Sequence, residues 1–323
     1  MAGLSATQSD TLGRILMLEP TFYGFYTTFQ RIERKNCFIS PLRYGGLGRI
    51  LGRLWGADFP KRERSGMGVI AVFNQKGGVG KTTTCLNLAA AWVRAGANPL
   101  LLDLDPQSHL SLASGVVAPP GAGMAAFFQH QTPLLRLLER TRSGWDLIPA
   151  TADLSKIDAL KGGDPKAATL LSRGMNAVVR ERSPILMDCC PNLGVLTLNA
   201  LLAADYVLIP VAADYLSLQG VYRLESALDV LEKRLKRTYP RRIVVTRFNP
   251  RRRLAFEVDR QLRERYGEDV CKTRIAENVA LATSPSVGQD VFRYAPHSGG
   301  ASDYAALAKE LSEAGFLRAV RKQ

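Results

Sequence analysis

The chain has 323 residues, and its 43 Lys and Arg against 29 Asp and Glu give a formal net charge of +14. Hydrophobic residues make up 46%, which excludes wholesale disorder, and no apolar run is long enough to cross a membrane. Five cysteines without a Cys-x-x-Cys pair make no disulfide framework, so a reduced, cytoplasmic protein is expected. The basic excess indicates a polyanionic partner, either nucleic acid or acidic lipid.

The first 66 residues differ in composition from the rest. They combine an aromatic cluster between Phe22 and Phe29 with a glycine-rich basic segment from Arg43 to Gly56, and they lack the apolar stretch of a signal peptide. Met67 directly precedes the first predicted core strand. We therefore expect residues 1–66 to be an N-terminal extension that is poorly ordered or a start-site artefact; a partner-binding or membrane-touching tail is the alternative. Residues 67–323 are predicted to form the folded domain.

From Val69 onward, short apolar runs typical of strands buried on both faces alternate with helical patterns. The predicted strands are Val69–Phe73, Leu100–Leu104, Trp145–Pro149, Ile185–Asp188, Tyr206–Val211, Ile243–Phe248 and Val270–Ile275. The predicted helices are Thr82–Ala95, Ala167–Glu181, Val195–Ala204, Ser217–Arg237, Leu254–Tyr266 and Asp303–Glu313. Residues 106–140 are expected to be a Gly/Pro-rich loop followed by a helical stretch. This order predicts an α/β fold, a doubly wound, mostly parallel sheet with helices on both faces.

A glycine-rich segment connects the first predicted strand to the first predicted helix. It reads Gly-Gly-Val-Gly-Lys-Thr-Thr at residues 77–83 and follows Lys76. Backbone N–H groups of such a loop surround phosphate oxygens, and the helix N-terminus adds its positive end. Lys81 is expected to reach the β- and γ-phosphates, and the Thr82 hydroxyl to bind Mg²⁺. The predicted nucleotide-binding residues are Lys76, Gly77, Gly78, Val79, Gly80, Lys81, Thr82 and Thr83.

Aspartates end two of the predicted strands. Asp188 ends an apolar strand, so its carboxylate is expected at the carboxyl edge of the sheet, beside the glycine loop and able to bind a water on Mg²⁺. Asp103 and Asp105 end a neighbouring strand, where strand alternation places both side chains on one face.

The glycine loop departs from the usual G-x-x-x-x-G-K-T pattern, because Gln75 stands at the position of the first glycine and a second lysine, Lys76, is present. It resembles the deviant Walker A loop, K-G-G-x-G-K-[ST], of the ParA/MinD ATPase superfamily. Leu102–Gln107 is similar to the D-x-D-P-Q segment of the ParA/Soj branch, and Ile185–Gly194 to its Walker B segment. The resemblance covers about residues 67–315. It implies a P-loop NTPase fold of the deviant Walker A type.

The resemblance also implies an activity, Mg²⁺-dependent hydrolysis of ATP, with ATP and Mg²⁺ as cofactors. Lys76, Lys81 and Asp105 are then the catalytic residues, and Thr82 and Asp188 the metal site. In the family, the aspartate at the position of Asp105 positions or activates the attacking water. The signature lysine at the position of Lys76 reaches across a homodimer to the phosphates of the partner subunit, where it acts as an arginine finger does. ATP would hold the dimer and hydrolysis would release it.

Positive charge is concentrated late in the chain. Residues 231–265 contain 13 basic and 4 acidic residues, whereas a purely solubilising charge would be spread out. We expect this cluster to bind DNA electrostatically and without sequence preference. The predicted DNA-binding residues are Arg241, Arg242, Arg251, Arg252 and Arg253.

Together these features predict a ParA-type partitioning ATPase, cytoplasmic and nucleoid-associated when ATP-bound. A ParB-like or cargo-adaptor protein would stimulate hydrolysis, and the cargo would be a plasmid, a chromosome or a protein assembly. No membrane partner is expected. The alternative is a MinD-like membrane-associated ATPase, which needs an amphipathic C-terminal helix; residues 315–323 are a short candidate. A metabolic ATPase or iron–sulfur reductase of the same superfamily is a third interpretation.

Overall fold

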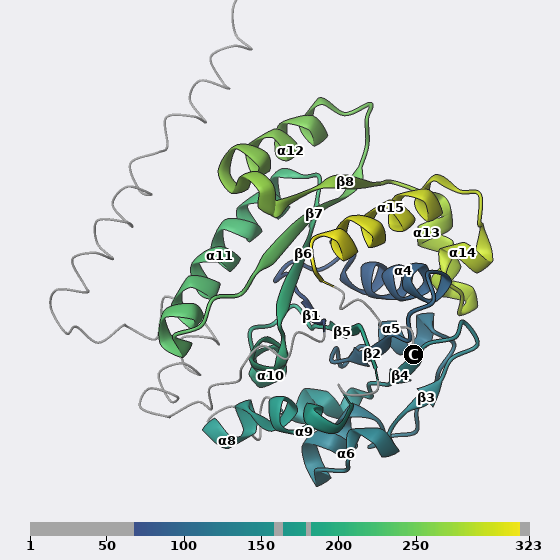
Figure 1. Ribbon diagram of the computed structural model, residues 1–323, viewed down its shortest axis with the longest axis vertical. Coiled ribbons are helices and arrows are strands. Elements are labelled where there is room, and N and C mark those ends of the chain that lie inside the picture. Colours follow the sequence, from purple (N-terminus) through teal and green to yellow (C-terminus); the bar gives the residue numbers. More distant parts are fainter. Residues whose placement is uncertain (1–67, 158–163, 179–181, 317–323) are drawn as a thin grey trace, which may run out of the picture.

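The computed structural model describes residues 68–157, 164–178 and 182–316 (Figure 1). The predicted N-terminal extension, residues 1–66, lies outside these residues. So do residues 317–323, most of the segment that the MinD-like alternative requires. None of the described helices has the length and apolar character needed to cross a membrane.

The described residues form an eight-stranded sheet in the order β3-β4-β2-β5-β1-β6-β7-β8. All neighbouring pairs are parallel except β3 with β4, so the predicted mostly parallel sheet is confirmed. The strands are β1 (Val69–Val72), β2 (Leu100–Asp103), β3 (Glu139–Arg140), β4 (Asp146–Ile148), β5 (Ile185–Asp188), β6 (Tyr206–Ala212), β7 (Arg241–Phe248) and β8 (Val270–Ala276).

Helices cover both faces of the sheet, as the doubly wound fold predicts (Figure 1). One face packs against α4 (Lys81–Arg94), α5 (His109–Ala113), α13 (Val279–Thr283), α14 (Val291–Tyr294) and α15 (Gly299–Glu313). The other packs against α6 (Met124–His130), α8 (Pro165–Ala168), α9 (Leu170–Val178), α10 (Val195–Ala203), α11 (Tyr215–Leu235) and α12 (Arg253–Tyr266). The described residues also include the 3-10 turns η2 (Leu134–Arg136), η3 (Ala152–Leu154), η4 (Gly267–Asp269) and η5 (Ser284–Val287).

Two hydrophobic cores result from strand alternation. In β1, Val69 and Ala71 belong to the core beneath α10 and α11, whereas Ile70 and Val72 belong to the core beneath α4 and α15. Successive side chains of a strand point to opposite faces, so a strand covered on both sides must be apolar throughout. This explains why β1 shows no polar alternation.

The prediction for residues 106–140 was wrong in detail. The predicted Gly/Pro-rich loop is present between α5 and α6, but the helical stretch ends at His130 and is followed by η2 and the edge strand β3, and α5 precedes the loop. The loop before α6 passes so close to the end of β4 that a Cβ on Gly123 would lie 2.0 Å from the carbonyl oxygen of Pro149. At the other end, Thr141 N–H donates to the carbonyl of Trp145 and turns β3 back onto β4.

The predicted helix Ala167–Glu181 is divided at Thr169 into α8 and α9, and residues 179–181 lie outside the described residues. A buried amide from α10 accounts for the break. The Asn199 side chain accepts a hydrogen bond from Leu171 N–H (3.0 Å) and donates one to the carbonyl of Ala167 (2.8 Å). These backbone groups therefore find a partner at the break without continuing the helix.

We expect Asn199→Leu to lower the free energy of unfolding by about 2 to 4 kcal/mol, because two buried backbone groups lose their partner while side-chain volume is nearly kept. Chemical denaturation monitored by circular dichroism would measure the change. Ser226→Ala is the control: its exposed hydroxyl bonds only within α11, and the expected change is within about 0.5 kcal/mol. Equal stability of the Asn199 variant and the wild type would contradict this account of the helix break.

Candidate functional site

The glycine loop lies between β1 and α4, where the sequence predicts a phosphate-binding loop. Gly78 and Gly80 have φ angles of 73° and 89°, a left-handed conformation that other residues adopt at a cost. An added Cβ on Gly77 or Gly78 would meet no atom within 4 Å, so the loop backbone is open to a ligand. Gly80 also forms the N-cap of α4 without a side-chain cap, which leaves the first N–H groups of that helix available to an anion.

The loop is held in place by two neighbouring strands. Asn74 donates to the carbonyl of Pro210 in β6 (2.8 Å) and accepts from Lys76 N–H (3.0 Å). On the other side, the Thr246 hydroxyl of β7 donates to the carbonyl of Val79 (2.8 Å). These contacts fix the loop conformation before any ligand binds. No local pattern in the sequence indicates these contacts, because the residues that they join are 136 and 167 positions apart along the chain.

Thr82 and Asp188, the predicted metal pair, are in direct contact. The Thr82 hydroxyl donates to Asp188 Oδ2 at 2.7 Å, and Asp188 Oδ1 is buried without a hydrogen-bond partner among the described residues. Burial, followed by the nearby charge of Asp103, raises the pKa of Asp188 well above its usual value. A hydroxyl oxygen and a carboxylate with an unused buried oxygen are ligands that suit Mg²⁺, so these residues fit the metal that the sequence predicts.

Lys81 is almost completely buried at the start of α4, and its Nζ donates to the carbonyl of Lys76 at 3.1 Å. This contact holds the lysine across the glycine loop. The loop thus brings together the residues predicted to bind phosphate. The sequence-predicted set Lys76, Gly77, Gly78, Val79, Gly80, Lys81, Thr82 and Thr83 forms one continuous turn from loop to helix.

Lys76 has partners within its own subunit. Its Nζ lies 2.7 Å from Asp214 Oδ1 and 2.9 Å from the Ser217 hydroxyl. Although partial burial opposes it, hydrogen bonding from Lys76 and Ser217 lowers the pKa of Asp214. Sequence reasoning missed both partners and began the helix at Ser217, whereas α11 begins at Tyr215 because Asp214 caps it through Ser217 N–H. An aspartate directly after a buried strand, followed by a helical pattern, was the available signal.

Asp103 and Asp188 face each other across adjacent strands, since Asp103 of β2 is paired in register with Asp188 of β5. Asp103 is fully buried, whereas Asp105 is partly exposed in the turn that follows β2. Strand alternation predicted that Asp103 and Asp105 share one face, but β2 ends at Asp103, so the alternation does not extend to Asp105. Burial raises the pKa of Asp103 to about 6, against hydrogen bonds from Ser111 and Asp105.

The five predicted DNA-binding arginines fall into two groups. Arg241 is bound by Glu225 (2.8 Å) and Glu232 (3.0 Å), and Arg242 by Asp269 (3.0 Å). Arg251, Arg252 and Arg253, at the start of α12, are exposed, and their side chains form no hydrogen bond or ion pair with the described residues. The structure therefore does not bring the five together as one free basic surface.

Comparison with known proteins is consistent with this geometry. A family profile described as an AAA domain matches residues 67–239, more than half of the chain. The chain is 41% identical over 245 residues to the chromosome-partitioning ATPase Soj of Thermus thermophilus, covering 75% of this chain and 94% of that protein. It is 34% identical over 250 residues to the sporulation initiation inhibitor protein Soj of Bacillus subtilis, covering 76% and 99%.

Solved structures share the fold. Cobyrinic acid a,c-diamide synthase from Mycobacterium smegmatis, with a bound ATP analogue and magnesium, is 27% identical with a TM-score of 0.65; the match covers 76% of this chain and 93% of that one. Apo McdA from Cyanothece is 20% identical with a TM-score of 0.67, covering 76% and 98%. With a P-loop of the deviant Walker A type and Soj relatives matched over nearly their whole length, the chain belongs to the ParA/Soj family of ATPases.

Proposed function

We propose that this ATPase partitions a DNA or protein cargo by binding DNA as an ATP-dependent homodimer. One observation carries the proposal: the sheet edge that holds the glycine loop also holds a second lysine, Lys76, and the carboxylates Asp105 and Asp188. The partitioning role is supported by the similarity to the chromosome-partitioning ATPase Soj of Thermus thermophilus. Residues 67–323 would form the ATPase domain, with residues 1–66 as an extension to it.

The loop amides and Lys81 would bind the phosphates of ATP, and Thr82 with Asp188 would hold Mg²⁺. Bound there, the metal would neutralise phosphate charge and would give the buried Oδ1 of Asp188 a partner. In this water-poor site, the attraction between Lys81 and the phosphates is stronger than it would be in bulk water.

Asp105 would orient the attacking water. Of the three carboxylates Asp103, Asp105 and Asp188, it is the one that is partly exposed, and it lies in the turn after the buried Asp103. Lys76 would act from one subunit on the nucleotide of the other. In the described structure, two of the three N–H donors of its ammonium bind Asp214 and Ser217 and hold the side chain within its own subunit, so reaching a phosphate of the partner subunit would compete with these contacts. Dimerisation thus competes with an ion pair inside each subunit.

Lys76→Ala is expected to abolish ATP-dependent dimerisation and to lower hydrolysis by about 10³-fold, as loss of an arginine finger does. Asp214→Asn keeps a helix-capping side chain but removes the competing charge. We therefore expect it to tighten ATP-dependent dimerisation about two- to fivefold, the range of a partly exposed ion pair. Analytical ultracentrifugation with ATP, ADP or no nucleotide would measure both. Weaker dimerisation of Asp214→Asn would contradict the competition between the two contacts.

The proposed DNA-binding surface is the arginine triplet Arg251–Arg253. Arg241 is held by two glutamates and Arg242 by Asp269, so neither charge is free to meet a phosphate without breaking an ion pair. Farther along α12, Arg260 is likewise bound to Glu257 and Glu264. The triplet offers three charges that need no such exchange, and release of counterions from DNA would favour its binding.

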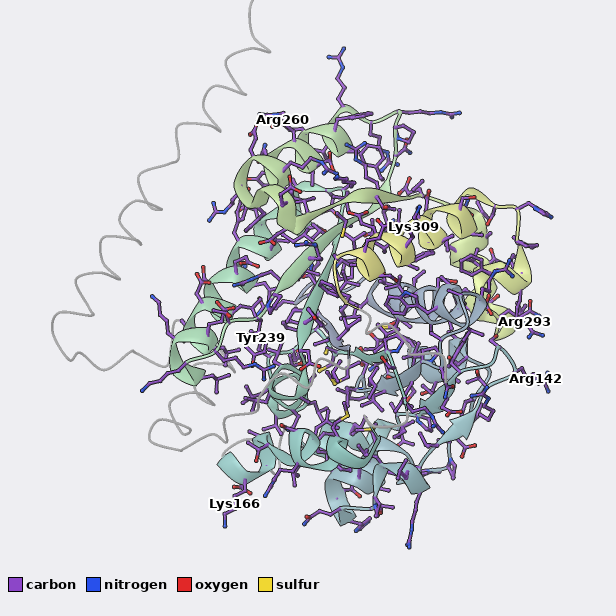
Figure 2. The ribbon with its side chains drawn as sticks, viewed as in Figure 1. Arg142, Lys166, Tyr239, Arg260, Arg293 and Lys309 are labelled. Atoms are coloured by element: carbon purple, nitrogen blue, oxygen red, sulfur yellow. The ribbon has the colours of Figure 1, made fainter. Side chains whose placement is uncertain are left out.

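Reversing the triplet with Arg251→Glu, Arg252→Glu and Arg253→Glu is expected to weaken DNA binding. The slope of log K against the logarithm of salt concentration should become less steep by roughly three. Fluorescence anisotropy with non-specific duplex DNA at two salt concentrations, with ATP or ADP, would measure this. The control reverses Arg142 in the turn between β3 and β4, Lys166 in α8 and Lys309 in α15; all three side chains are exposed, and the control changes net charge equally (Figure 2).

ATP-dependent dimerisation should be unchanged in both triple variants, since neither touches the glycine loop. DNA affinity that is unchanged in the triplet variant, or that falls equally in the control, would refute this surface. A ParB-like or cargo-adaptor protein is proposed as the stimulating partner, and the ATP-bound dimer is proposed to reside on the nucleoid in the cytoplasm.

A further inference from the structure

Asp103 ties together both ends of the turn that carries Asp105. Its Oδ1 accepts from Asp105 N–H at 3.2 Å. Its Oδ2 accepts from Ser111 N–H at 2.9 Å and from the Ser111 hydroxyl at 2.6 Å. One buried carboxylate therefore spans the segment from Asp105, the second residue after β2, to the first turn of α5. The position of Asp105 depends on where this carboxylate is held.

Ser111 determines that position through a second contact. Its hydroxyl donates to Asp103 and accepts from Ala150 N–H at 3.0 Å, just beyond β4. A hydroxyl has one donor and two acceptor sites, so it can serve both partners at once. Ser111 is almost completely buried, which protects both bonds from exchange with water. The chain of contacts runs from Ala150 through Ser111 and Asp103 to Asp105.

We propose that Ser111 is a positioning residue for ATP hydrolysis: its hydroxyl anchors Asp103 to the end of β4 and so holds Asp105 in place for the attacking water. The inference rests on the proposed role of Asp105. The side-chain hydrogen bonds of Ser111 join Asp103 and Ala150, and within the described residues none of them reaches the glycine loop or the metal pair. Its loss should therefore slow the chemical step more than it weakens nucleotide binding.

The surroundings of Ser111 provide a conservative variant. Ser111, Leu112, Thr151 and neighbouring residues border an open pocket of about 230 Å³, so free space adjoins the residue to which Ser111→Thr would add one methyl group. Ser111→Thr would keep the hydroxyl and its two contacts. A matched control lies at the C-cap of the same helix, because the Ser114 hydroxyl is buried without a hydrogen-bond partner among the described residues.

The test is steady-state ATP hydrolysis by the full chain, with KM and the nucleotide Kd measured in parallel. Ser111→Ala is expected to lower kcat on the order of tenfold, as a lost hydrogen bond to a charged group does, with KM and Kd within about twofold of wild type. Ser111→Thr should restore most of kcat. Ser114→Ala should resemble the wild type, since it removes a buried hydroxyl that bonds no described residue.

The variant Asp105→Asn distinguishes a failure of the proposed role of Ser111 from a failure of the proposed role of Asp105. Loss of hydrolysis in Asp105→Asn with wild-type kcat in Ser111→Ala would overturn the role of Ser111 and leave the proposed function intact. Full activity of Asp105→Asn would overturn the role of Asp105 itself. Failure of Ser111→Thr to recover kcat, or an equal loss in Ser114→Ala, would also overturn the inference. If Ser111→Ala does not fold, Ser111→Cys, a weaker donor of similar size, replaces it; an intermediate kcat is expected, and wild-type kcat would overturn the proposal.

Discussion

Parallel pairing of β2, β5, β1 and β6 places the carboxyl ends of four buried strands at one edge of the sheet. Each strand ends in or leads into a polar group there: Asp103 ends β2 and Asp105 follows it, Asp188 ends β5, the glycine loop follows β1 and Asp214 follows β6. In-register pairing brings Asp103 opposite Asp188. Since the strands themselves are apolar and covered on both faces, this edge is where chemistry can occur. Every feature of the candidate site depends on this alignment.

Burial of two carboxylates, Asp103 and Asp188, makes their charged forms costly in free energy. It raises the pKa of Asp103 to about 6 and that of Asp188 well above its usual value. The fold compensates with donors placed nearby, the Thr82 hydroxyl for Asp188 and the Ser111 hydroxyl and N–H for Asp103. One oxygen of Asp188 stays unpaired among the described residues. A buried acceptor without a donor is costly in a protein interior, and a cation would remove that cost.

Ion pairing decides how the basic excess can act. Most arginines of the cluster are engaged within the fold; Arg263 binds Asp259, and Arg237 donates to backbone carbonyls of Leu202 and Ala204. Such residues join α11, α12, β7 and β8 to one another. At the start of α12, by contrast, Arg251–Arg253 are exposed. Net charge therefore describes the long-range attraction to a polyanion, while the folded structure selects which charges can reach it.

Local patterns in the sequence determined where most strands lie along the chain, where the phosphate loop lies, and which aspartates end strands. Each of these features arises from neighbouring residues, such as an apolar run or a glycine turn before a helix. The tertiary structure alone decided which groups meet. Lys76 and Asp214 are 138 residues apart, Thr246 and Val79 are 167 apart, and Ser111 joins Asp103 to Ala150. The break between α8 and α9 depends on Asn199 from another helix. Hydrogen bonds and ion pairs are short-range, so their partners are set by strand order and helix packing and not by spacing along the chain.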